Sequence, residues 1–248
     1  MTPLRRRTPV LRTFHAAPDA ASRLVCFPHA GGSAPYYFPL SLALSPAVEV
    51  FGMQYPGRMD RSDEPAAEDI ATLADEAATL IAAAPQPPPA LFGHSMGALV
   101  AFETARRLEQ QHGITPSVLI VSGMRSPSQP RRSQDWDREE VLLDELRLLA
   151  GTHPGLLENE ELRELFLPVL RSDFRAVSTY PGDTTTVLSC PITAFSGDED
   201  PVTPDGMEHW AAHTSAPFTS RSFPGDHFYL TGFPAPVVDG IRAALARR

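Results

Sequence analysis

A serine stands between two glycines in the segment Gly93-His94-Ser95-Met96-Gly97. This GxSxG spacing is typical of a nucleophile on a sharp turn from a strand into a helix, where the neighbouring backbone passes too close for a Cβ. The apolar run 90–93 before the motif predicts a strand, and residues 96–112 after it have helical spacing. Because both halves of the required context are expected, Ser95 is the candidate nucleophile.

A serine hydroxyl becomes an effective nucleophile when a histidine removes its proton and an acid orients that histidine. On this kind of turn the partners follow in the order serine, acid, histidine. Two later segments, GDED (197–200) and GDHF (225–228), follow the predicted strands 192–196 and 219–223. The ends of parallel strands meet at one edge of a sheet. The sequence therefore predicts a triad of Ser95, Asp200 and His227.

Several acids compete for the orienting role. We favour Asp200 because it lies three residues beyond Gly197, where the loop has cleared the strand. Asp198 and Glu199 are the alternatives. Asp226 is the neighbour of the histidine in the chain and would point away from it on an extended turn.

The tetrahedral intermediate of acyl transfer also needs N–H donors for its oxyanion. One donor is expected from the backbone of Met96, the residue after the nucleophile. The second is expected from the loop FPHAGGS (27–33), which follows the predicted strand 23–27 and contains glycines that permit unusual backbone conformations. By its position in this loop, Ala30 is the expected second donor.

The composition excludes several other chemistries. The chain has 248 residues, a formal net charge of −9 at pH 7, and 21 basic residues that are all arginine. Without lysine there is no P-loop lysine, no lysine Schiff base and no serine–lysine pair. The acidic balance argues against nucleic acid as a partner. Cys26 and Cys190 are too few for a disulfide framework or a cysteine-rich zinc site, so we expect no metal.

The chain shows no sign of a membrane or export segment. No apolar stretch reaches the ~18 residues of a membrane span, and the start MTPLRRRTPVLR lacks the apolar stretch that follows the charges of a signal peptide. We therefore expect a cytoplasmic protein with no membrane partner.

Short apolar runs alternate with helical patterns, which predicts one α/β domain over residues 1–248 with a mostly parallel sheet flanked by helices. Between 122 and 190 the alternation fails, and two amphipathic patterns, with Pro168 expected to kink or split the second, predict an inserted helical lid at about 126–188. Trp136, Phe166, Phe174 and Tyr180 are candidates for its inner wall. The predicted strands are 23–27, 48–54, 90–93, 117–122, 192–196 and 219–223, and the other predicted helices are 69–84, 96–112, 206–213 and 236–247.

Six segments in order resemble the discrete type II thioesterases that accompany polyketide synthases and nonribosomal peptide synthetases, members of the α/β-hydrolase superfamily. The resemblance covers nearly the whole chain. The segments are PHAGGSA (28–34), QYPGR with a following DR (54–61), GHSMGALVAFE (93–103), SGMRSP (122–127), GDEDPV (197–202) and GDHF (225–228). The chain departs from the family pattern at Met59 and Met124, which the family more often fills with glycine and arginine.

The resemblance implies the triad and oxyanion donors named above and a helical lid over a channel for phosphopantetheine, which enters as part of the substrate, so that no cofactor is needed. It implies hydrolysis of acyl or aminoacyl thioesters on carrier proteins, as an editing step for stalled assembly lines. The alternatives are a small-molecule carboxylesterase and a product-releasing thioesterase or cyclase.

Contacts with the substrate or carrier are assigned to the matching motifs and to nearby arginines. Carrier proteins are acidic, so docking on this acidic chain requires a local basic surface. The residues assigned to these contacts are His29, Tyr55, Arg58, Arg125, Arg131 and Arg132, with Arg61 beside them in sequence.

Overall fold

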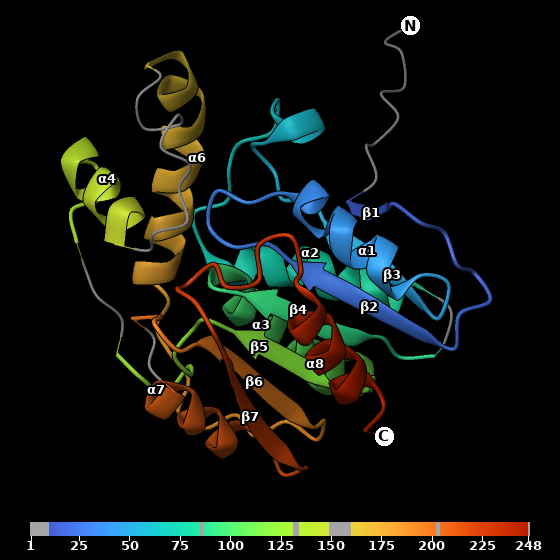
Figure 1. Ribbon diagram of the computed structural model, residues 1–248. Coiled ribbons are helices and arrows are strands. Elements are labelled where there is room, and N and C mark those ends of the chain that lie inside the picture. The colour runs from blue at the N-terminus through green and yellow to red at the C-terminus, as the bar shows by residue number, and fades with distance from the viewer. Residues whose placement is uncertain (1–9, 85–86, 131–133, 149–159, 202–203, 248) are drawn as a thin grey trace, which may run out of the picture.

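A seven-stranded sheet forms the centre of the computed structural model, which describes residues 10–84, 87–130, 134–148, 160–201 and 204–247 (Figure 1). The strand order is β1-β3-β2-β4-β5-β6-β7. Every neighbouring pair is parallel except β1 with β3. The mostly parallel sheet that the sequence predicts is therefore confirmed. The strands are β1 (Leu11–Thr13), β2 (Ser22–Phe27), β3 (Val48–Met53), β4 (Ala90–His94), β5 (Leu119–Ser122), β6 (Ile192–Gly197) and β7 (Phe218–Phe223).

Helices cover both faces of the sheet, and each face has its own apolar core. One core joins the sheet to α2 and α3, and the other joins it to α1 and α8 (Figure 1). Helix α2 begins directly after Asp69, whose carboxylate accepts a hydrogen bond from the Thr72 N–H at 2.6 Å. The helices packed on the sheet are α1 (Phe38–Leu44), α2 (Ile70–Ala82), α3 (Met96–His112), α7 (Pro204–Glu208) and α8 (Ala235–Leu245), with short 3₁₀ turns at Ala34–Tyr37, Met59–Arg61 and His209–His213.

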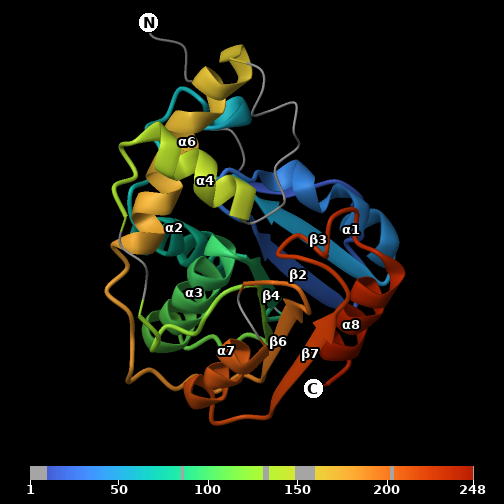
Figure 2. The same cartoon turned by 60° about the vertical axis from the view of Figure 1, so that its left-hand side comes forward.

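Between β5 and β6, the described residues include two inserted helices. Helices α4 (Glu139–Leu148) and α6 (Glu160–Ser178) stand to one side of the sheet and share a small apolar core of their own (Figures 1 and 2). Helix α6 continues through Pro168, so of the two expectations for this proline, a kink or a split, the split is wrong. Leu167 and Leu170, on either side of the proline, are both buried in the small core, and this packing holds the two halves together.

Two elements were not expected from the sequence. Strand β1 has only three residues and joins the edge of the sheet antiparallel to β3, so it has no periodic pattern to find. Helix α1 has seven residues, one of them Pro39, which is too short a span for a helical period to stand out. Within the described ranges, no helix is long and apolar enough to cross a membrane.

Candidate active site

Ser95 lies on the tight turn that joins β4 to α3. Its backbone has φ 53° and ψ −124°, a conformation that residues other than glycine rarely adopt. A Cβ on Gly93 would lie 2.1 Å from the carbonyl oxygen of Gly97, and one on Gly97 would lie 2.0 Å from that of Phe27. Both glycines are therefore required by the close approach of β2, β4 and α3. The Ser95 N–H donates to the carbonyl oxygen of Ser122 at 2.8 Å, which ties the turn to β5.

Asp200 and His227 meet at the ends of β6 and β7. The two carboxylate oxygens of Asp200 lie 3.1 and 3.0 Å from Nδ1 of His227. Both residues are buried. Within the described part of the chain, Nε2 of His227 is buried without a hydrogen-bond partner. The acid on Nδ1 leaves Nε2 as the nitrogen that can act on a neighbouring hydroxyl.

The carboxylates of two competing acids have other partners, and the third acid is held through its backbone. Asp198 accepts a hydrogen bond from the Gly225 N–H at 2.8 Å, and Asp226 accepts one from the Phe228 N–H at 2.7 Å. The Glu199 N–H donates to the carbonyl oxygen of Gly225 at 2.9 Å. These contacts shape the two loops, and they leave Asp200 as the acid that faces the histidine.

A cavity of about 180 Å³ brings the candidate residues together. Ser95, His227 and Ala30 line it on the side of the sheet, and Trp136 and Phe174 line it on the side of the inserted helices. The two aromatic rings are stacked, with centroids 4.9 Å apart. Residues far apart in the sequence therefore line the same cavity as the serine.

Of the other residues that the sequence analysis singled out near the site, some line the cavity and others do not. Met124 lines the cavity, whereas Met59 is 60% exposed. Met96 is fully buried as the first residue of α3, directly after the serine. Phe166 is exposed on α6, and Tyr180 does not face the cavity but donates to a carboxylate oxygen of Glu103 on α3 at 2.7 Å.

Three imidazoles lie side by side at the site. The ring of His94 is 4.9 Å from that of His227 and 5.9 Å from that of His29, between centroids. Burial and the nearby His227 lower the pKa of His29 to about 3, and burial lowers the pKa of His94 well below its usual value. Both rings are therefore neutral near pH 7, and Asp200 is paired with His227 alone among the three.

Sequence reasoning missed the residues that hold His94. Its Nδ1 lies 2.9 Å from Oγ of Ser122, and that oxygen lies 2.7 Å from the hydroxyl of Tyr229. All three are buried. The position of His94 inside the GxSxG motif was visible in the sequence, but no spacing rule connects it to a tyrosine that follows the other end of the sheet.

Several residues assigned to carrier contact are buried instead. Arg58 forms a bidentate ion pair with Asp173, with both N–O distances 2.8 Å, and Arg61 is paired with Glu64 and Glu76. Neither side chain is on the surface, so the assignment of Arg58 to docking is wrong.

Tyr55 and His29 are also packed inward. The hydroxyl of Tyr55 donates to the carbonyl oxygen of Pro28 at 3.4 Å, and the Tyr55 ring is fully buried. The ring of His29 packs edge-on against Tyr36 and Phe228. Both side chains therefore support the loop 27–33 rather than extend from the protein.

Arg125 is exposed and lines the cavity. Arg131 and Arg132 lie outside the described residues. Within the described ranges, no group of three or more His, Cys, Asp or Glu side chains is arranged to hold a metal ion.

The neutral histidines predict a pH dependence of stability. Below about pH 6.5 the unfolded chain protonates His29 while the folded site keeps it neutral, so the unfolded state binds more protons and stability falls as the pH is lowered. The slope from His29 is at most about 1.4 kcal/mol per pH unit between pH 6 and 4. The free energy of unfolding, measured with urea at several pH values, should depend less on pH in His29→Phe, which keeps a ring in place, than in the wild type. Equal slopes would contradict this account.

Three comparisons with known proteins bear on the site. Residues 22–244 match the thioesterase domain family. The chain is 48% identical over 227 residues to thioesterase PikA5 of Streptomyces venezuelae, covering 89% of this chain and 79% of that protein. It is 45% identical over 223 residues to a probable cadicidin biosynthesis thioesterase of Streptomyces griseus, covering 89% of this chain and 62% of that protein.

A solved structure agrees with these matches. The type II thioesterase BorB from the borrelidin biosynthetic cluster is 43% identical to the chain and superposes with a TM-score of 0.86, covering 95% of this chain and 97% of BorB. The fold and the family that the six sequence segments predict are both confirmed. The chain therefore belongs to the thioesterase family, whose members hydrolyse thioester bonds on the α/β-hydrolase fold.

Proposed function

We propose that Ser95, His227 and Asp200 form a catalytic triad that hydrolyses acyl thioesters carried on the phosphopantetheine arm of carrier proteins. The observation that carries this proposal is the contact of both Asp200 carboxylate oxygens with Nδ1 of His227, at 3.0 and 3.1 Å. The same histidine and Ser95 line one cavity, so the base and the nucleophile share a space that an acyl group can enter.

In the acylation step, Nε2 of His227 takes the proton of the Ser95 hydroxyl as its oxygen bonds to the thioester carbonyl carbon. The carbonyl oxygen becomes an oxyanion, and the N–H groups of Ala30 and Met96 are the proposed donors to it. The carbon–sulfur bond then breaks, and His227 returns the proton to the departing thiolate of the arm. The products are an acyl ester on Ser95 and a free thiol on the carrier.

In the deacylation step, water takes the place of the thiol. His227 removes a proton from the water as its oxygen attacks the acyl ester, and the proton goes to the oxygen of Ser95 when the ester bond breaks. Asp200 keeps the imidazole in the right tautomer and stabilises its charged form. The acyl group leaves as a carboxylic acid, and the enzyme returns to its starting state without a cofactor.

The substrate class is supported by the relatives and by the form of the cavity. One similar protein is named a probable cadicidin biosynthesis thioesterase, and another is a type II thioesterase from the borrelidin biosynthetic cluster. The cavity has apolar walls at Trp136 and Phe174, and the exposed Arg125 also lines it. We propose that the acyl chain contacts the aromatic walls while the arm enters from the side of Arg125, and that the reaction clears stalled acyl groups.

The triad is tested by three substitutions. Ser95→Ala should lower kcat by about 10⁶ and Asp200→Asn by about 10⁴, because the first removes the nucleophile and the second misorients the base. Asp198→Asn is the matched control, since that carboxylate accepts a hydrogen bond from the Gly225 N–H and is not the one on Nδ1 of His227, and it should stay within about tenfold of the wild type.

These variants are assayed on a panel of acyl-carrier proteins and on the matching p-nitrophenyl esters. Equal acyl release by the wild type and Ser95→Ala would refute the mechanism. Turnover of the esters without turnover of the carriers would favour a carboxylesterase.

Docking of an acidic carrier is tested at Arg125. Charge reversal in Arg125→Glu should raise KM for the acyl-carrier protein about tenfold or more, because a like charge then faces the acidic partner. KM for a small acyl thioester should stay unchanged. Arg242→Glu on α8, also exposed, is the matched control and should leave both values unchanged. Equal effects of Arg125→Glu on both substrates would contradict a docking role.

A further inference from the structure

A buried ion pair links helix α6 to the loop that carries Ala30. The side chains of Arg58 and Asp173 are 6% and 1% exposed, and they meet through two N–O contacts of 2.8 Å. Removing both charges from water costs several kcal/mol, so a buried pair is weak support for stability by itself. The pair also contacts the backbone of the loop that carries Ala30.

The pair holds both sides of one peptide segment. A carboxylate oxygen of Asp173 accepts the Gly31 N–H at 2.7 Å, and Nη1 of Arg58 donates to the carbonyl oxygen of Gly32 at 3.0 Å. The guanidinium of Arg58 also lies over the ring of Tyr55, 5.3 Å from its centroid. The Gly31 N–H and the Gly32 carbonyl are thus both held by charged side chains.

Residues 29–32 form a turn, and the conformation of this turn sets the direction of the Ala30 N–H. The Gly32 N–H donates to the carbonyl oxygen of His29 at 2.9 Å, and Gly31 has φ +75° at the third position of the turn, as in a type II turn. The His29 carbonyl and the Ala30 N–H belong to the same planar trans peptide, so they point in opposite directions. Fixing the carbonyl therefore fixes the direction of the Ala30 N–H.

Helix α6 also packs directly on this turn. A Cβ on Gly31 would lie 2.6 Å from Cδ2 of Leu170, so the leucine occupies the space above the glycine. Leu170 and Asp173 are three residues apart and lie on the same face of the helix. One face of α6 thus supplies both the apolar contact and the carboxylate that hold the turn.

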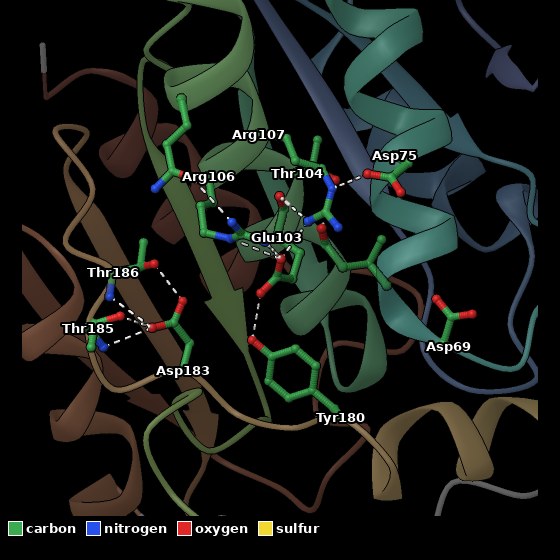
Figure 3. A network of polar contacts seen from close by, with 12 residues as sticks. Asp69, Asp75, Glu103, Thr104, Arg106, Arg107, Tyr180, Asp183, Thr185 and Thr186 are labelled. Carbon is green, nitrogen blue, oxygen red and sulfur yellow. Dashed lines mark hydrogen bonds and ion pairs between the residues drawn. The ribbon is translucent and has the colours of Figure 1, made fainter.

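The end of α6 is anchored independently of the turn. Tyr180, two residues past the helix, donates to a carboxylate oxygen of Glu103 at 2.7 Å, and Glu103 is paired with Arg106 and Arg107 (Figure 3). Arg107 also contacts Asp75 on α2. This second anchor joins α6 to α3 and α2 through residues other than those that hold the turn, which makes it a suitable control.

We propose that Asp173 and Arg58 are positioning residues for the oxyanion hole, so that the seating of helix α6 and the alignment of the Ala30 N–H occur together. This inference rests on the proposed function, because it assigns to the pair the task of aiming a donor used in that reaction. Neither residue touches the substrate. Their effect is expected on the stabilisation of the oxyanion and not on the binding of the ground state.

The test uses Asp173→Asn, which keeps the volume of the side chain but replaces an acceptor oxygen with a donor. On an N-acetylcysteamine thioester of a short acyl group, kcat should fall about 10- to 100-fold, somewhat less than the loss of a whole oxyanion donor, while KM stays within about threefold. Affinity for a trifluoromethyl ketone with the same acyl chain should fall by the same factor as kcat, because its adduct places an oxyanion in the hole.

Tyr180→Phe is the control for a merely structural effect. It removes the second anchor of α6 and should lower the Tm without changing kcat or the affinity for the ketone. If Tyr180→Phe lowers kcat as much as Asp173→Asn does at the same loss of Tm, or if Asp173→Asn keeps wild-type kcat and ketone affinity, the positioning role is refuted.

Two further variants keep the test decisive. Should Asp173→Asn fail to fold, Arg58→Lys replaces it, because lysine keeps the charge but cannot donate to both carboxylate oxygens and to Gly32 together, and the same loss of kcat is expected. Ser95→Ala separates the two proposals. Hydrolysis by Ser95→Ala at the wild-type rate would refute the proposed function, whereas a Ser95→Ala rate about 10⁶-fold below wild type beside a fully active Asp173→Asn would refute only the positioning role.

Discussion

The backbone turn at Ser95 is the constraint on which the rest of the structure depends. A residue with φ 53° must be held by its surroundings, and here β4 lies between β2 and β5 while α3 starts directly after the serine. The chain passes so closely that Gly93 and Gly97 have no room for a Cβ. Strain of this kind persists only where packing determines the backbone completely, and it presents the serine at the edge of the sheet where the other strand ends converge.

The second half of the site comes from residues inserted far from this turn. Helices α4 and α6 have a small core of their own, which includes Trp136 just before α4 and Phe174 on α6. These two rings line the cavity, and Asp173 on α6 accepts a hydrogen bond from the Gly31 N–H. In the account proposed here, the sheet presents the nucleophile and the base, and the inserted helices complete the acyl space and steady the oxyanion donors. Helix α6 would thus both line the cavity that receives the acyl group and help to fix the direction of the Ala30 N–H.

The sequence predicted the sheet, most helices and the meeting of Asp200 with His227, because periodicity and the convergence of parallel strand ends are local or topological rules. It could not predict the burial of Arg58, whose partner Asp173 lies 115 residues away in a region without strands. The hydrogen bonds that link His94 to Ser122 and Ser122 to Tyr229 could not be predicted for the same reason. Pairings between distant polar side chains depend on how the inserted helices pack, and an arginine in a polar motif looks the same in the sequence whether it is buried or exposed.

The central claim is that acyl groups pass through an ester on Ser95. Rapid-quench intact mass spectrometry of the protein mixed with an acyl-carrier protein measures this directly. The account predicts a transient mass increase equal to the acyl group, located on the peptide that contains Ser95 and absent in Ser95→Ala. Release of the acid with no modified protein at any time, or a modification on another residue, would contradict it.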